Sequence, residues 1–140
     1  MVAKLKTERA NGTDRIIITA SDVDRLLGLI ETAAARAAPE AADILAEKLD
    51  IADALPGEDV PEDVVTMRSH VEFRDDESGR VQRVTLAYPG EEDIAAGKIS
   101  VLTPIGLALL GHAAGQTARW VTRSGKERSL TVLKVLFQPE

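Results

Sequence analysis

The chain has 140 residues, of which 44% are hydrophobic and 29% are charged, and this composition predicts a soluble globular domain, with at most a small appendage, rather than a disordered or membrane protein. Only 3% of the residues are aromatic, which argues against an aromatic-lined ligand pocket and against an RNA-binding sheet that stacks bases. The chain has no cysteine, so disulfides, thiolate zinc sites and cysteine nucleophiles are excluded.

The net charge of −6 is distributed unevenly along the chain. Residues 1–68 hold 8 basic and 14 acidic side chains, whereas residues 69–140 hold 9 of each. An acidic first half would repel a nucleic-acid backbone and would suit a basic partner surface or a cation, although it can equally be a solvated face. The first residues lack the apolar segment of a signal peptide, which predicts a cytoplasmic protein without a membrane partner.

The first half of the chain predicts an extended run followed by two helices. Residues 15–19 are rich in isoleucine and are expected to form a strand or an extended arm. Ser21 is the expected N-cap of a helix, which apolar residues at helical spacing continue to Ala37. Pro39 ends this helix and takes the first position of a second helix, which is expected to reach Ala54.

Two amphipathic helices joined by so short a turn are expected to pack antiparallel, as a short coiled-coil hairpin. Each arm would contain about 17 residues and would project by roughly 25 Å. Residues 21–55 hold three basic and eight acidic side chains, so most of the negative charge lies on the hairpin.

A linker at residues 55–61, rich in proline, glycine and acids, is the expected domain boundary. It divides the chain into an arm and hairpin at 1–57 and a second domain at 58–140. Alternating apolar residues there predict a small α+β domain with an antiparallel sheet and one short helix, in which Thr103 is the N-cap and Pro104 the first residue. The expected strands are 64–66, 69–74, 80–88, 98–101, 117–121 and 128–137, and the expected helix is 103–110.

Glu40 and Asp43 are the only pair of acids placed where chemistry could use them. Their spacing of three residues puts both carboxylates on one face at the tip of the hairpin, where they could share a divalent cation such as magnesium with a partner. The alternative is that they simply complement the positive end of the helix dipole. No other cofactor is expected.

The remaining polar groups carry weaker signals. His70 and His112 lie far apart in the sequence and are expected to be ordinary surface or half-buried side chains. A basic cluster surrounds the last predicted strand hairpin and is weak evidence for nucleic acid, because such clusters usually form a solvated edge. Its members are Arg119, Arg123, Lys126 and Arg128.

Three segments resemble a known family. Residues 61–74, with PEDVVTMRS and VEFR, are followed by LAYP at residues 86–89, and residues 99–111 read ISVLTPIGLALLG. Together they resemble the bacterial GreA/GreB transcript cleavage factors and, more closely, their relatives of the Rnk family, the regulators of nucleoside diphosphate kinase. The resemblance covers residues 16–139.

The resemblance implies an FKBP-like second domain without isomerase activity that docks on RNA polymerase near the secondary channel. The segment that matches the docking motif comprises Ser100, Thr103, Pro104, Ile105 and Gly106. Alternatively, Pro104 and Gly106 merely shape the short helix, and both interpretations can hold.

Three functions are compatible with this resemblance. Gre factors use two acids at the tip of a long hairpin to hold a catalytic magnesium. The shorter hairpin here favours a regulator that does not stimulate cleavage. Such a regulator would compete with Gre-type factors and would make no specific contact with nucleic acid. The first alternative is Gre-like stimulation of transcript cleavage by Glu40 and Asp43. The second, a working prolyl isomerase, is disfavoured by the shortage of aromatic residues.

Overall fold

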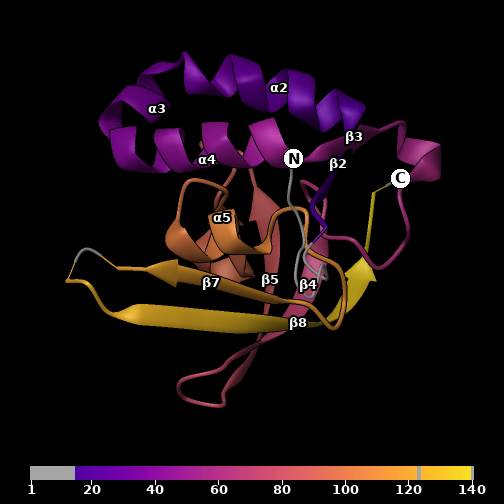
Figure 1. The fold of residues 1–140 in the computed structure, drawn as a ribbon, viewed down its shortest axis with the longest axis vertical. Coiled ribbons are helices and arrows are strands. Elements are labelled where there is room, and N and C mark those ends of the chain that lie inside the picture. Colours follow the sequence, from indigo (N-terminus) through magenta and orange to yellow (C-terminus); the bar gives the residue numbers. More distant parts are fainter. Residues whose placement is uncertain (1–14, 123, 140) are drawn as a thin grey trace.

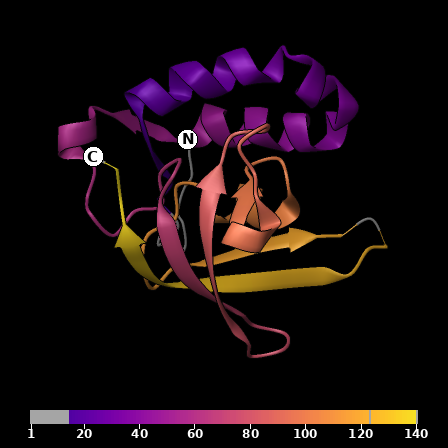
Figure 2. The same cartoon turned by 180° about the vertical axis from the view of Figure 1, so that it is seen from behind.

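The computed structural model describes residues 15–122 and 124–139, so the predictions for residues 1–14 and for Arg123 lie outside the described residues. Within this range the chain has the α+β architecture expected from its sequence. A helical hairpin covers one side of the molecule, and a curled five-stranded sheet packs against a short helix below it (Figures 1 and 2). The elements are β2 (Ile17–Thr19), α2 (Ala20–Ile30), α3 (Ala33–Ala37), α4 (Pro39–Ile51), β3 (Asp53–Leu55), η1 (Gly57–Asp59), β4 (His70–Asp75), β5 (Val81–Ala87), η2 (Ile94–Ala96), β6 (Lys98–Ser100), α5 (Pro104–Leu109), β7 (Thr117–Val121) and β8 (Glu127–Phe137).

The hairpin differs from its prediction at three points. Thr19, not Ser21, is the N-cap of α2, and its hydroxyl accepts a hydrogen bond from the Asp22 backbone N–H at 3.0 Å. The predicted first helix is broken after Ile30, because the Thr32 hydroxyl donates to the Leu29 carbonyl and caps α3. The second helix begins at Pro39 as expected but ends at Ile51 rather than Ala54, since β3 pairs in parallel with β2.

The hairpin lies flat on the molecule, so the prediction of a projecting arm is wrong. The helices α2 and α4 have 11 and 13 residues, which correspond to lengths of about 16 and 20 Å. Figure 1 shows both helices running across α5, with the α3 end of the hairpin above the turn that joins β7 and β8. Leu26 of α2 and Leu45 of α4 are fully buried in the same hydrophobic core as the sheet.

The sheet has the strand order β6-β5-β4-β8-β7. Its strand pairs are antiparallel except for β5 and β6, which are parallel. The prediction of an antiparallel sheet is therefore wrong for this one pair. Residues 64–66 do not form the predicted strand: Val64 makes only an isolated bridge to Ala113. Val60 and Val64 beside this bridge are buried and form a small cluster with Ile17 of β2 and Leu55 of β3.

Backbone and side-chain hydrogen bonds attach α2 and β2 to loops that flank the sheet and α5. The Asp22 carboxylate accepts from the Met67 backbone N–H at 3.1 Å and from the Tyr88 hydroxyl at 3.3 Å. The Ile17 N–H donates to the Gly111 carbonyl at 3.1 Å, at a position where Gly111 adopts a φ of 85° and a Cβ would lie 2.5 Å from Ile16. In the described part of the chain, no helix is long and apolar enough to cross a membrane.

Candidate partner-binding groove

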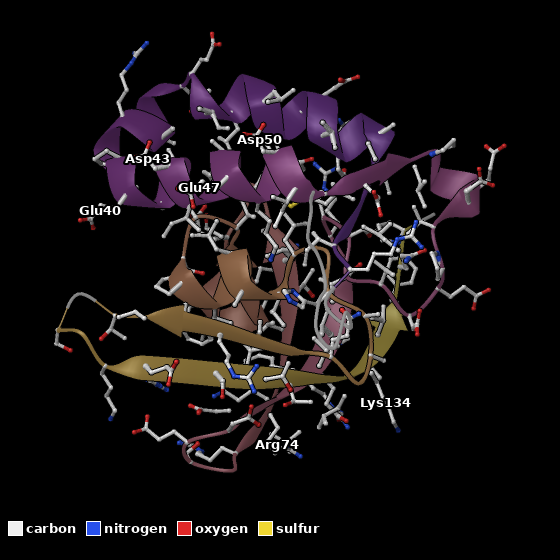
Figure 3. All side chains as sticks on the ribbon, viewed as in Figure 1. Glu40, Asp43, Glu47, Asp50, Arg74 and Lys134 are labelled. Carbon is white, nitrogen blue, oxygen red and sulfur yellow. The ribbon has the colours of Figure 1, made fainter. Side chains whose placement is uncertain are left out.

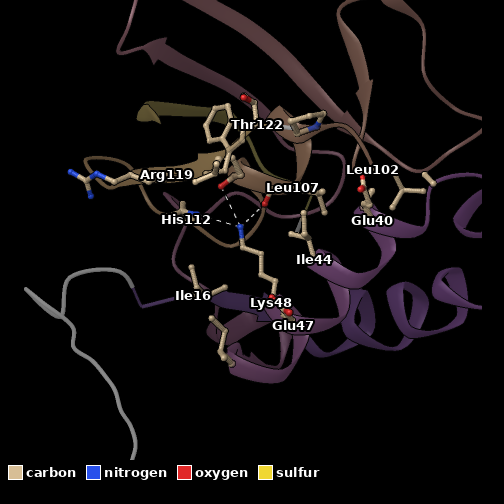
Figure 4. A pocket seen from close by; sticks show the side chains of 18 of the residues that line it. Ile16, Glu40, Ile44, Glu47, Lys48, Leu102, Leu107, His112, Arg119 and Thr122 are labelled. Carbon is tan, nitrogen blue, oxygen red and sulfur yellow. Dashed lines mark hydrogen bonds between the residues drawn. The ribbon is translucent and has the colours of Figure 1, made fainter. Parts of the chain in front are cut away.

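A groove of about 1070 Å³ separates α4 from α5 and β7 (Figure 4). Large apolar side chains on its walls are exposed, with Ile44 at 51%, Ile51 at 72% and Val121 at 65%. Exposed apolar side chains gathered around a concavity are typical of a surface that contacts another molecule. The other apolar residues that line the groove include Ile16, Leu102, Pro104, Leu107 and Trp120.

Lys48 of α4 lies at the floor of the groove. Its amino group donates to the carbonyl oxygens of Leu107 at 2.6 Å and Ala108 at 3.3 Å, and it lies 3.5 Å from Nδ1 of His112 (Figure 4). Burial, which disfavours the charged form, lowers the pKa of Lys48 to about 7. Lys48 therefore satisfies carbonyls at the end of α5 and attaches the hairpin to that helix.

The two histidines have different environments. His112 is buried, contrary to its prediction, and burial together with the neighbouring Lys48 charge lowers its pKa to about 3. Its ring is therefore neutral at physiological pH. His70 is half-buried as expected, and its Nδ1 lies 2.9 Å from the Thr85 hydroxyl.

Sequence reasoning missed Lys48, although a signal was present. Lys48 follows Leu45 by three residues and precedes Ala52 by four, so it falls within the apolar stripe of the helix rather than among its acids. A lysine within such a stripe indicates that its amino group makes hydrogen bonds inside the fold rather than with solvent.

The predicted docking residues come together at the start of α5. The Thr103 hydroxyl accepts from the Gly106 N–H at 3.0 Å and donates to the Ser100 carbonyl at 2.7 Å. Ser100 and Gly106 are buried, and a Cβ on Gly106 would lie 2.3 Å from the Ser100 carbonyl oxygen. These three residues shape the segment, whereas Pro104 is exposed on the groove and Ile105 is half-buried, so both are accessible to a partner.

Glu40 and Asp43 are both exposed at the α3 end of the hairpin. Glu40 lines the groove and Asp43 does not, and Figure 3 shows the two side chains apart. Within residues 15–122 and 124–139, no group of three or more histidines and acids could hold a metal ion. Any cation at the tip would therefore need ligands from elsewhere.

Two members of the basic cluster, Lys126 and Arg128, pair with acids at the end of β4 and in the β4–β5 turn. Arg128 lies 2.9 Å from Asp75 and 3.0 Å from Glu77, and Lys126 also pairs with Glu77. Arg119 is exposed and lines the groove. Lys126 and Arg128 thus hold the β4–β5 turn against the strand hairpin formed by β7 and β8.

Comparisons with known proteins agree with the resemblance seen in the sequence. Residues 60–137 match the model for the C-terminal domain of the transcription elongation factors GreA and GreB, and residues 14–55 match the Rnk N-terminus. The chain is 39% identical over 125 residues to a regulator of nucleoside diphosphate kinase from Escherichia coli K12, covering 89% of this chain and 91% of that protein. A GreA from Acidiphilium cryptum is 33% identical over 93 residues, which cover 66% of this chain and 59% of that protein.

A solved structure is also similar to the chain. A GreA/GreB elongation factor from Nitrosomonas europaea superposes with a TM-score of 0.69 and 36% identity, covering 88% of this chain and 98% of that one. The chain therefore belongs to the GreA/GreB family of bacterial transcription elongation factors, as a member of its Rnk branch of regulators of nucleoside diphosphate kinase.

Proposed function

We propose that the chain is a cytoplasmic regulator that binds RNA polymerase near its secondary channel, does not stimulate transcript cleavage and competes with Gre-type factors. The observation that carries this proposal is the exposed Pro104 at the edge of an apolar groove, within the segment that matches the family docking motif. Thr103 and Gly106 hold this segment rigid, which limits the entropy lost on docking. By analogy with its named relatives, the chain would also affect nucleoside diphosphate kinase.

The position of the hairpin supports the non-cleaving mode. Helices of 11 and 13 residues give the hairpin little reach, and Lys48 and Asp22 attach them to α5 and to the loop before β4. The tip, with Glu40, lies beside the groove instead of extending beyond the sheet.

A pull-down with purified core polymerase tests the proposal. The wild-type chain should be retained at micromolar concentration, and Pro104→Asp, which places a charge at the docking segment, should weaken retention about tenfold or more. Ile94→Asp is the matched control, because Ile94 is 80% exposed on η2 and does not line the groove. Absence of binding, or equal binding by Pro104→Asp, would contradict the proposal.

Gre-like stimulation of transcript cleavage is the second candidate. The exposure of both Glu40 and Asp43 at the hairpin tip favours it. A stalled elongation complex with magnesium decides between the two, because cleavage that the double variant Glu40→Ala, Asp43→Ala abolishes would establish this candidate. A prolyl isomerase in an FKBP-like domain has less support, since Trp120 is the only Phe, Tyr or Trp among the described residues that line the groove.

A further inference from the structure

The strand β7 is at the edge of the sheet, and one side of its backbone is unpaired. In an antiparallel pair, only alternate residues of a strand exchange hydrogen bonds with the neighbouring strand, which for β7 is β8. The Thr122 N–H donates to the Lys126 carbonyl at 2.8 Å, and the Gln116 carbonyl accepts from the Val132 N–H at 3.0 Å, so even-numbered residues of β7 face β8.

The N–H and C=O groups of Thr117, Arg119 and Val121 consequently point away from the sheet. In the described part of the chain these groups have no backbone hydrogen-bond partner, and no other strand pairs with this edge. Such an edge is a template for an additional strand.

The groove lies along this open edge. All five residues of β7 line it, and α4 forms the opposite wall with Ile44 and Ile51. An added strand would therefore place alternate side chains against an apolar surface.

The α4 wall is also acidic. Four acids are spaced along its exposed side, of which Glu40 and Glu47 line the groove (Figure 3). The only basic residue of α4, Lys48, donates a hydrogen bond from its amino group to a backbone carbonyl of α5. The single exposed cation among the described groove residues, Arg119, is on the β7 side. Basic side chains of an occupant would thus be attracted to the α4 wall.

We propose that the open edge of β7 binds an extended segment of a partner protein as a sixth strand, and that this segment alternates apolar and basic residues. Main-chain hydrogen bonds to Thr117, Arg119 and Val121 provide the register, and the apolar groove and the carboxylates of α4 select the side chains. The inference concerns a mode of binding and does not require the partner to be RNA polymerase.

Titration of the full ¹⁵N-labelled chain with a capped peptide of alternating lysine and valine tests the proposal by NMR. Amide signals of Thr117, Arg119 and Val121 should shift at millimolar peptide, and their hydrogen exchange should slow. The amides of Ala118 and Trp120 should keep their exchange rates, because they already bond to β8. A peptide in which glutamate replaces lysine should bind several-fold more weakly.

Two pairs of variants separate the parts of the proposal. Val121→Pro removes only an outward N–H, which an edge strand tolerates, and should weaken binding about threefold to tenfold relative to Val121→Ala. Glu47→Lys should weaken binding about twofold to fivefold. Asp50→Lys makes the same change on α4 outside the groove and should bind like wild type.

Three results would overturn the proposal. The first is an absence of binding at millimolar peptide, or binding whose shifts map outside the groove. The second is equal binding by Val121→Pro and Val121→Ala, which would show that no strand is added. The third is a dimer at the concentration of the titration that dissociates in Val121→Pro, which would assign the edge to a second copy of the chain.

Discussion

The buried amino group of Lys48 predicts a pH dependence of stability that one substitution should remove. Burial lowers its pKa from 10.5 to about 7. The unfolded chain keeps this proton up to pH 10.5, so between pH 7 and 10.5 it binds more protons than the folded chain. The free energy of unfolding therefore rises with pH in this window. At pH 7 half of the folded molecules carry the proton and at pH 9 almost none do, so the increase between these values is about 2 kcal/mol.

Urea unfolding of the wild type and of Lys48→Met at pH 7, 8 and 9 measures this contribution. Methionine keeps a flexible stem but cannot titrate. We expect the free energy of unfolding of the wild type to increase by about 2 kcal/mol more than that of the variant. Lys98→Met, at an exposed lysine of β6, is the matched control and should keep the wild-type dependence on pH. A difference between wild type and Lys48→Met that is constant across this range would refute the burial of the amino group.

Three further substitutions test the packing around the groove and the hairpin. Gly106→Ala should lower the free energy of unfolding by about 1–3 kcal/mol in urea, because its Cβ would lie 2.3 Å from the Ser100 carbonyl oxygen. Gly28→Ala, on α2 where a Cβ meets no atom within 4 Å, should instead raise it by about 0.5–1 kcal/mol, and equal effects would contradict the tight packing at Gly106. Burial and then the Asp22 charge raise the pKa of Tyr88, so Asp22→Asn should lower that pKa in an ultraviolet titration. An unchanged Tyr88 pKa would mean that the contact between α2 and the sheet is absent in solution.

Local signals in the sequence predicted most of the elements correctly. Pro39 begins α4, Thr103 and Pro104 begin α5, and the last two strands pair across the predicted turn. Each of these features depends on a few neighbouring residues, through a fixed proline φ, a capping hydroxyl or a turn. The family resemblance was likewise carried by short contiguous segments, and the comparisons confirm it.

Features that depend on distant contacts could not be predicted in this way. Residues 53–55 continue a helical pattern and become β3 only because β2 lies beside them. The parallel pairing of β6 with β5 is likewise fixed by tertiary packing. The groove combines α4, α5 and β7, so neither its acidic wall nor the open edge of β7 is visible before these elements are assembled.

The orientation of the hairpin is the clearest example of a feature that depends on distant contacts. Its helical stripes indicated two packed helices but not the surface against which they pack. Leu26, Leu45 and the hydrogen bonds of Asp22 and Lys48 place the hairpin over α5. This position turns an expected projecting arm into one wall of a groove.

The most direct test of the account is a transcript cleavage assay on a stalled RNA polymerase complex that contains a Gre factor. With increasing amounts of the chain, we predict that Gre-stimulated cleavage falls, while the chain alone produces no shortened RNA. Unchanged Gre-stimulated cleavage, or shortened RNA produced by the chain alone, would contradict the account.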